Sequence, residues 1–177
     1  METLRGQLLV ATPALIDPNF RRSVVLIGEH SEEGALGVVL NRPAAQTIDE
    51  VAPEVGQEGA LYVGGPVQPG SLLVLAEFED PSDAGLLIVD RIGFTSPGAD
   101  LAVLDGWARQ VRFFAGYAGW GPGQLDGEVE NGDWIPLAFV VDDAFGIEPE
   151  TLWPRVLERQ GGRLALLARM PDDPSVN

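Results

Sequence analysis

The residues best suited to chemistry include Glu29 and His30, which end an apolar run at residues 23–29 (SVVLIGE). A histidine beside a carboxylate can act as a general base or as a metal ligand. Adjacent residues on an extended chain point to opposite faces, however, so these two side chains need not meet. The competing interpretation is a loop histidine that is hydrogen-bonded to backbone. We treat Glu29 and His30 as the second-ranked candidate site.

The stretch Gly119–Gln124, within the segment 112–128 (RFFAGYAGWGPGQLDGE), supplies candidate ligand contacts at Trp120, Gly121 and Gln124. A strand, a glycine turn and a helix start are expected here, and bare backbone N–H groups at such a turn can hold an anion. The segment is not GxGxxG, and the acids at 126, 128 and 130 oppose a bound phosphate. The alternative is structural, with Gly121 as N-cap, Pro122 at the first helical position and Gln124 reaching back to the cap.

Another polar group lies at the ends of a predicted hairpin and comprises Asn19, Ser23, Asn41 and Arg42. Strands at 23–29 and 35–41 (ALGVVLN) around a loop at 31–34 pair Glu29 near Leu36 and Val24 near Asn41. This register places the polar group about 17–20 Å from His30. The two candidate sites therefore cannot easily share one small ligand.

Arg42 and Asn41 together can bind a carboxylate or phosphate in a bidentate manner. The alternative is that Asn41 caps a turn while Arg42 packs over the sheet and pairs with an acid. The densest basic patch, Arg21-Arg22, lies close by in the sequence.

Charge and composition exclude several functional classes. The 177 residues carry 11 basic groups, all arginine, against 27 acidic ones, so the net charge is −16. Such a field disfavours direct nucleic-acid binding. Cysteine is absent and His30 is the single histidine, which removes cysteine nucleophiles and histidine-rich metal sites. A carboxylate-only magnesium site from Glu128, Asp142 and Asp143 is conceivable, but surface acids are the better interpretation. We expect no metal and no cofactor.

The remaining patterns predict the elements that position these residues. Strands are expected at 7–11, 61–63, 72–78, 86–89 and 134–141, with Pro136 indicating an edge. Helices are expected from Thr47, at 98–110 and at 149–160. Residues 1–170 form one α+β domain in this interpretation and 171–177 a flexible tail. The start lacks signal-peptide features, and no apolar run is long enough to cross a membrane, so we expect a cytoplasmic protein.

Four blocks resemble the AlgH/YqgE family, a widespread group of bacterial proteins. They are GQLLVATP at 6–13, EHSEEGALGVVLNRP at 29–43, YVGGPV at 62–67 and FAGYAGWGPGQLDGE at 114–128. The resemblance implies a single α+β domain with a bent, barrel-like, mixed and largely antiparallel sheet and a few short helices. It also implies the label of transcriptional regulator, without a general mechanism and without an established catalytic residue.

Three functional hypotheses follow. The first is a non-enzymatic regulatory or binding module for a small anionic ligand or a protein partner, which uses the face near Trp120 and Arg42. The second is a hydrolase-type enzyme that uses His30 or carboxylates. The third, less favoured because of the charge, is a regulator that binds DNA directly.

Overall fold

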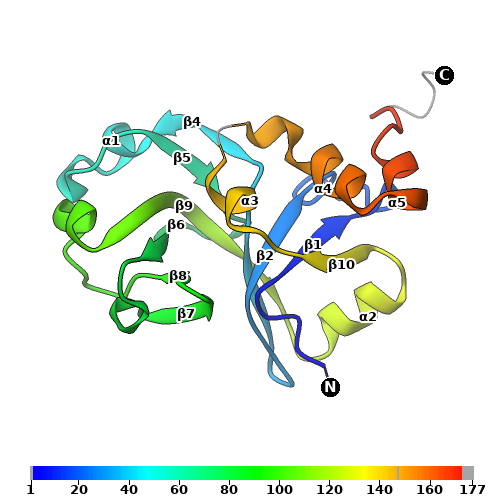
Figure 1. Cartoon of the computed structure of the whole chain (residues 1–177), viewed down its shortest axis with the longest axis horizontal. Coiled ribbons are helices and arrows are strands. Elements are labelled where there is room, and N and C mark those ends of the chain that lie inside the picture. The colour runs from blue at the N-terminus through cyan, green and yellow to red at the C-terminus, as the bar shows by residue number, and fades with distance from the viewer. Residues whose placement is uncertain (1, 147, 173–177) are drawn as a thin grey trace.

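A curled, open sheet forms the centre of the computed structural model, which describes residues 2–146 and 148–172 (Figure 1). Eight strands follow the order β10-β1-β2-β3-β9-β6-β8-β7, and β4 and β5 join through β9. The strands are β1 (Gln7–Ala11), β2 (Val24–Ser31), β3 (Gly34–Val39), β4 (Pro43–Thr47), β5 (Ala60–Val63), β6 (Val67–Phe78), β7 (Leu86–Val89), β8 (Ile92–Phe94), β9 (Ala108–Trp120) and β10 (Trp134–Ala138). All pairings are antiparallel except β5 with β9. The predicted α+β fold with a bent, mixed sheet is confirmed, and the sheet curls without closing.

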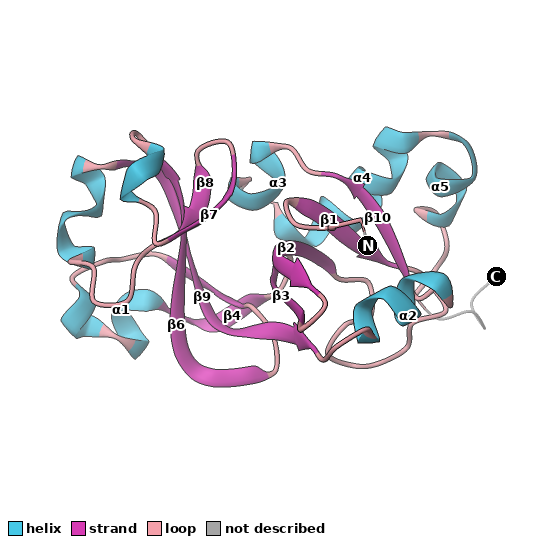
Figure 2. Cartoon of the chain, turned by 90° about the horizontal axis from the view of Figure 1, so that it is seen from below, coloured by secondary structure: helices cyan, strands magenta, loops and turns pink. Residues whose placement is uncertain are grey.

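The helices are short and lie around this sheet (Figure 2). They are α1 (Ile48–Val51), α2 (Gln124–Glu130), α3 (Val141–Phe145), α4 (Leu152–Gln160) and α5 (Gly162–Leu167), with single-turn 3₁₀ segments η1 (Pro53–Val55), η2 (Pro81–Asp83) and η4 (Pro149–Thr151) and a longer one, η3 (Leu101–Gly106). The pair α4 and α5 lies at the end of the molecule that contains β10, whereas α1, β7 and β8 lie at the other end (Figure 1). Within the described residues, no helix has the length and apolar character needed to cross a membrane.

The hairpin of β2 and β3 has the register that the sequence predicts. Glu29 pairs with Leu36, and the Leu40 amide donates to the Val24 carbonyl at the other end. Gly37 lies in close backbone contact with β2, opposite a β-bulge at Gly28. The register shifts between Ile27 and Glu29, and a Cβ at position 37 would lie 2.5 Å from the Leu26 carbonyl oxygen.

Both faces of the hairpin are covered, as the continuous apolar run of β2 predicts. One face carries Leu26, which packs in a cluster with residues of α4 such as Trp153 and Val156. The opposite face carries Ile27, which packs in a cluster with Trp120 and Trp134. The alternation of side chains along β2 therefore separates two cores and leaves the polar groups at the ends of the strands.

The helix predicted at 98–110 is wrong. Its first part forms η3, and β9 begins already at Ala108. Gly98 has a φ of +82°, and Trp107 leaves the helical path to stack on Phe78, with ring centroids 5.6 Å apart. The apolar stripe that resembles a helix face is therefore divided between a 3₁₀ turn and a strand.

Other boundaries differ less. The helix at Thr47 is present, with the Glu50 carboxylate accepting from the Thr47 amide at 2.9 Å, and Pro154 lies in the first turn of α4. β10 is an edge strand that ends at Ala138 rather than 141, and α3 follows. The sequence patterns gave no sign of β4, β8, α3 or α5. In the predicted tail, residues 173–177 lie outside the described residues.

Candidate anion-binding site

Three of the 11 arginines, Arg21, Arg22 and Arg42, line one cavity of about 680 Å³. They come from the loop between β1 and β2 and from the residue before β4. α4 contributes Trp153 and Pro154 to the wall, and two carboxylates also line it, Glu150 from η4 and Asp172 from the segment after α5. The cavity thus gathers positive charge in a chain whose net charge is −16.

The loop at 17–23 is held rigidly by its own hydrogen bonds. The Asp17 carboxylate accepts from the Asn19 amide at 2.8 Å, and the Asp17 carbonyl accepts from the Arg21 amide at 2.7 Å. The Phe20 ring packs against Trp120, with centroids 6.2 Å apart, and so anchors the loop to the second core. The fully buried Ser23 hydroxyl donates to the Phe20 carbonyl at 2.6 Å.

Asn41 fixes the backbone of Arg22. Its Oδ1 accepts from the Val24 amide at 3.0 Å, and its Nδ2 donates to the Arg22 carbonyl at 2.9 Å. Arg22 has a φ of +53°, a left-handed conformation that a non-glycine residue keeps only when its surroundings hold it. Ser23 and Asn41 therefore position the arginines, because their own polar atoms are already engaged.

The guanidinium groups have distinct environments. Arg22 lies over the Trp153 ring, with Cζ 4.4 Å from the centroid, a cation–π contact that orients it. Arg42 donates to the Arg21 carbonyl. Burial lowers the pKa of the Arg42 guanidinium from its usual value, but arginine remains charged at neutral pH. Partial burial strengthens its attraction for an anion.

The segment that follows α5 contacts two of these arginines. Arg22 Nε lies 2.6 Å from the Asp172 carboxylate, and Arg22 also donates to the Met170 carbonyl at 2.6 Å. Arg21 donates to the Asp172 carbonyl. A carboxylate and two carbonyl oxygens are thus already seated against the arginine cavity.

Asn19 lines an adjoining cavity of about 370 Å³ that shares Arg42 with the first. Its other walls are mostly apolar and include Val39, Val63 and Pro66. Asn19, Ser23, Asn41 and Arg42 are therefore brought together at the open end of the hairpin, in the arrangement that its register predicts.

Trp120 lies at the opposite, loop end of the hairpin. β3 pairs with β9 so that Ala35 is opposite Trp120 and Leu36 opposite Gly119. Trp120, Glu29 and His30 line a separate cavity of about 640 Å³, to which Arg5 also contributes. The two hairpin ends thus line different cavities, and Trp120 does not lie in the arginine cavity.

Gly121 and Gln124 form the predicted reach-back contact. The Gly121 amide donates to Gln124 Oε1 at 3.0 Å. The helix nevertheless begins at Gln124 with Gly123 as its N-cap, two residues later than predicted. The side-chain Nε2 of Gln124 donates to Glu128 Oε1 at 3.0 Å, so both polar atoms of the Gln124 side chain are hydrogen-bonded.

His30 is a structural residue by its geometry. Its side chain is 1% exposed, its Nδ1 accepts from the Leu4 amide at 3.0 Å, and its Nε2 lies 3.3 Å from the Asp126 carboxylate. Because Nδ1 accepts, the ring proton lies on Nε2 and points at the carboxylate. Neither nitrogen keeps a free lone pair for general-base chemistry. Glu29 is exposed and lies on the other face of β2, so the two neighbours do not form a pair.

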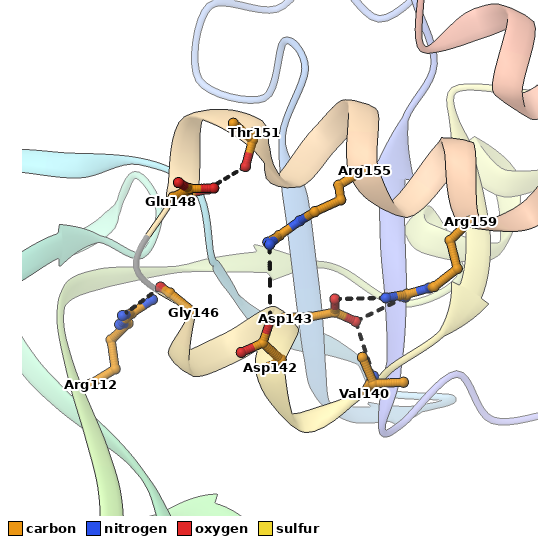
Figure 3. A network of polar contacts seen from close by, with 9 residues as sticks. All are labelled: Arg112, Val140, Asp142, Asp143, Gly146, Glu148, Thr151, Arg155 and Arg159. Carbon is orange, nitrogen blue, oxygen red and sulfur yellow. Dashed lines mark hydrogen bonds and ion pairs between the residues drawn. The ribbon is translucent and has the colours of Figure 1, made fainter.

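The acids considered for magnesium have other partners. Glu128 on α2 accepts hydrogen bonds from the indole N–H groups of Trp120 and Trp134. Asp142 and Asp143 lie on α3 and form ion pairs with arginines of α4 (Figure 3). In that network, Asp143 accepts from both terminal nitrogens of Arg159 and caps the Val140 amide. Among the described residues, no cluster of three or more potential metal-ligating side chains is present.

Five residues that contribute to these sites were not among the residues predicted from the sequence. Arg21 and Arg22 were noticed only as a basic patch, although their position between Asn19 and Ser23 was the available signal. Trp153 and Asp172 join the cavity from more than 100 residues away, and no local pattern indicates this. Asp126 meets His30 across 96 positions for the same reason.

Comparison with known proteins places this fold among similar chains. Residues 8–165 match the model of the AlgH-like family, DUF179. A UPF0301 protein of Streptomyces avermitilis is 43% identical over 187 residues, covering 100% of this chain and 97% of the relative. One from Thermobifida fusca is 43% identical over 190 residues, with 99% and 96% covered.

Two solved structures share the architecture over nearly their whole length. A crystal structure of a protein from Corynebacterium diphtheriae has a TM-score of 0.81 at 32% identity and covers 95% of this chain and 93% of its own. The solution structure of the AlgH protein from Pseudomonas aeruginosa has a TM-score of 0.74 at 28% identity, with 97% and 98% covered. The chain therefore belongs to the AlgH-like family, as its four sequence blocks predict.

Proposed function

We propose that this protein is a binding module that takes up a small anionic ligand, a phosphate or carboxylate compound, in the cavity lined by Arg21, Arg22 and Arg42. The observation that carries the proposal is the convergence of three arginines on one cavity in a chain of net charge −16. Guanidinium groups match the planar, bidentate geometry of carboxylate and phosphate. We expect the module to act in the cytoplasm and to regulate rather than catalyse.

The engaged state of the surrounding groups supports binding rather than catalysis. The polar atoms of Ser23 and Asn41 serve the backbone, and the guanidinium groups lack the proton-transfer chemistry that a general acid or base supplies. The hydrolase alternative uses His30 or carboxylates, and the two ring nitrogens of His30 are already hydrogen-bonded. The carboxylates that line the cavity are Glu150 and Asp172, and Asp172 is paired with Arg22.

The first prediction concerns these arginines. Isothermal calorimetry with pyrophosphate and with citrate should detect binding to the wild type at low ionic strength. Arg21→Gln or Arg42→Gln removes a charged donor, so we expect each to weaken binding roughly 10- to 100-fold. Arg91→Gln is the matched control, because Arg91 donates to the Glu79 carbonyl near β8 and does not line the cavity.

Two results would contradict the proposal. One is equal affinity in the wild type and both cavity variants. The other is the absence of measurable heat with either anion in the Asp172→Asn variant, in which the carboxylate that pairs with Arg22 is neutral. Circular dichroism of each variant establishes that it is folded.

A further inference from the structure

The segment Met170–Asp172 supplies to the arginine cavity the same chemical groups that an external anion would supply. Its Asp172 carboxylate lies 2.6 Å from Arg22 Nε, and its two carbonyl oxygens accept from Arg21 and Arg22. The segment thus occupies hydrogen-bond donors of Arg21 and Arg22, two of the three arginines. Arg42 instead donates within the loop, to the Arg21 carbonyl.

The segment is weakly held apart from these contacts. The preceding α5 has no fully buried residue, the Asp172 side chain is 75% exposed, and Met170 is 43% exposed. Among the described residues, the backbone of the segment makes one further hydrogen bond, in which the Met170 amide donates to the Leu167 carbonyl. Segments with few buried contacts open at low free-energy cost.

The arginine loop, the Arg22 guanidinium and the Arg42 guanidinium have supports outside the segment. Asn41 fixes the Arg22 carbonyl and Trp153 supports its guanidinium, while the 17–23 loop is tied by Asp17 and Ser23. Departure of Met170–Asp172 would therefore leave the loop backbone and the Arg22 guanidinium in place, and its return would engage Arg21 and Arg22 again.

We propose that Asp172 is a tethered competitor for the arginine cavity, so that an anionic ligand binds only as Met170–Asp172 leaves. This inference rests on the proposed function and adds its regulation. The tether gives the carboxylate an effective concentration in the millimolar range, on the order of that of abundant cellular anions. The segment thus raises the ligand concentration that is needed to occupy the guanidinium groups of Arg21 and Arg22.

The test compares Asp172→Asn with the wild type in calorimetric titrations with pyrophosphate. The amide keeps the size of the side chain and removes its charge, so we expect affinity to rise roughly 3- to 10-fold. Asp105→Asn is the matched control, because it makes the same change in net charge at an exposed residue of η3 that does not line the cavity. We expect its affinity to remain within about 1.5-fold of the wild type, since distant surface charges are screened.

A second readout follows the segment directly. The chain has two methionines, Met1 and Met170, so the methyl NMR spectrum of methionine-labelled protein is simple. Saturation with pyrophosphate should shift and sharpen the Met170 methyl signal as the segment leaves, and Asp172→Asn should move the signal in the same direction without ligand.

The outcomes separate the two proposals. Equal pyrophosphate affinity in the wild type and Asp172→Asn, or a Met170 signal that stays unchanged at saturation, overturns the competitor and leaves anion binding intact. The absence of binding in both proteins overturns anion binding and the competitor together. An equal gain in Asp172→Asn and Asp105→Asn assigns the effect to net charge and also overturns the competitor.

Discussion

At the scale of single residues, the Glu128 carboxylate accepts hydrogen bonds from two tryptophans. Its Oε2 accepts from Trp120 Nε1 at 2.8 Å and from Trp134 Nε1 at 2.9 Å, and its Oε1 accepts from Gln124. Both indoles are buried, at 7% and 3% exposure. Glu128 therefore supplies the acceptor for the N–H groups of two buried tryptophans, which explains an acid on a helix that packs against a core.

The second prediction follows from these bonds. Glu128→Ala leaves two buried N–H donors without an acceptor, so we expect the free energy of unfolding to fall by about 2–4 kcal/mol. Glu128→Gln keeps one acceptor oxygen and should lose only about 1–2 kcal/mol. Urea titration followed by far-UV circular dichroism measures both. Glu130→Ala, at an exposed position of the same helix, should stay within about 0.5 kcal/mol of the wild type.

Two ion pairs between α3 and α4 show, at the element scale, how burial decides what a charge pair contributes (Figure 3). Asp143 is 4% exposed and meets Arg159 at 2.9 and 3.0 Å, whereas Asp142 is 79% exposed and lies 3.9 Å from Arg155. The hydrogen bond to Asp143 raises the pKa of Arg159. The two pairs join the same helices and so form an internal comparison.

The third prediction uses that comparison. Asp143→Ala removes the cap of the Val140 amide and leaves a half-buried guanidinium without its partner, so we expect a loss of about 2–3 kcal/mol in the free energy of unfolding. Asp142→Ala should change it by no more than about 0.5 kcal/mol. Thermal and urea unfolding of both variants measure the difference. Equal losses would contradict the assignment of the stabilisation to the buried pair.

Elements with a local signature were predictable, and elements defined by distant packing were not. The β2–β3 register follows from loop length and from the period of two along a strand, and β1 and β7 were predicted with the observed bounds. The 98–110 segment failed because its helical stripe is overridden by the stacking of Trp107 on Phe78. For the site, Asn41 and Arg42 were found from hairpin geometry, but Trp153 and Asp172 reach the cavity only through the folding of the whole chain.

The charge distribution sets the behaviour of the whole molecule. A net charge of −16 repels polyanions at long range, whereas under the proposed function the arginine cavity attracts small anions that fit within it. A small ligand has little charge outside the cavity to be repelled, but a duplex extends over the acidic surface around it. Size therefore discriminates between anions that share the same phosphate chemistry.

The fourth prediction applies this argument to DNA. A short duplex should show no binding by fluorescence anisotropy at physiological salt, while pyrophosphate binding persists and weakens as salt rises. The anisotropy of the labelled duplex is measured again as the salt concentration is lowered stepwise, which reveals any nonspecific binding. Duplex binding that survives physiological salt would overturn the charge argument and would favour a regulator that contacts DNA directly.

Because the Arg22 guanidinium lies over the Trp153 ring, the fluorescence of Trp153 should report changes in the cavity. An indole changes its emission when a cation above its ring moves or is neutralised, and Trp153 also donates its N–H to the buried Ala11 carbonyl at 2.8 Å, so the ring itself is held still. Movement of the arginine therefore registers against a stationary chromophore. Under the proposed function, ligand binding should therefore change the emission of Trp153, one of the four tryptophans of the chain, and a screen of metabolites needs no added label.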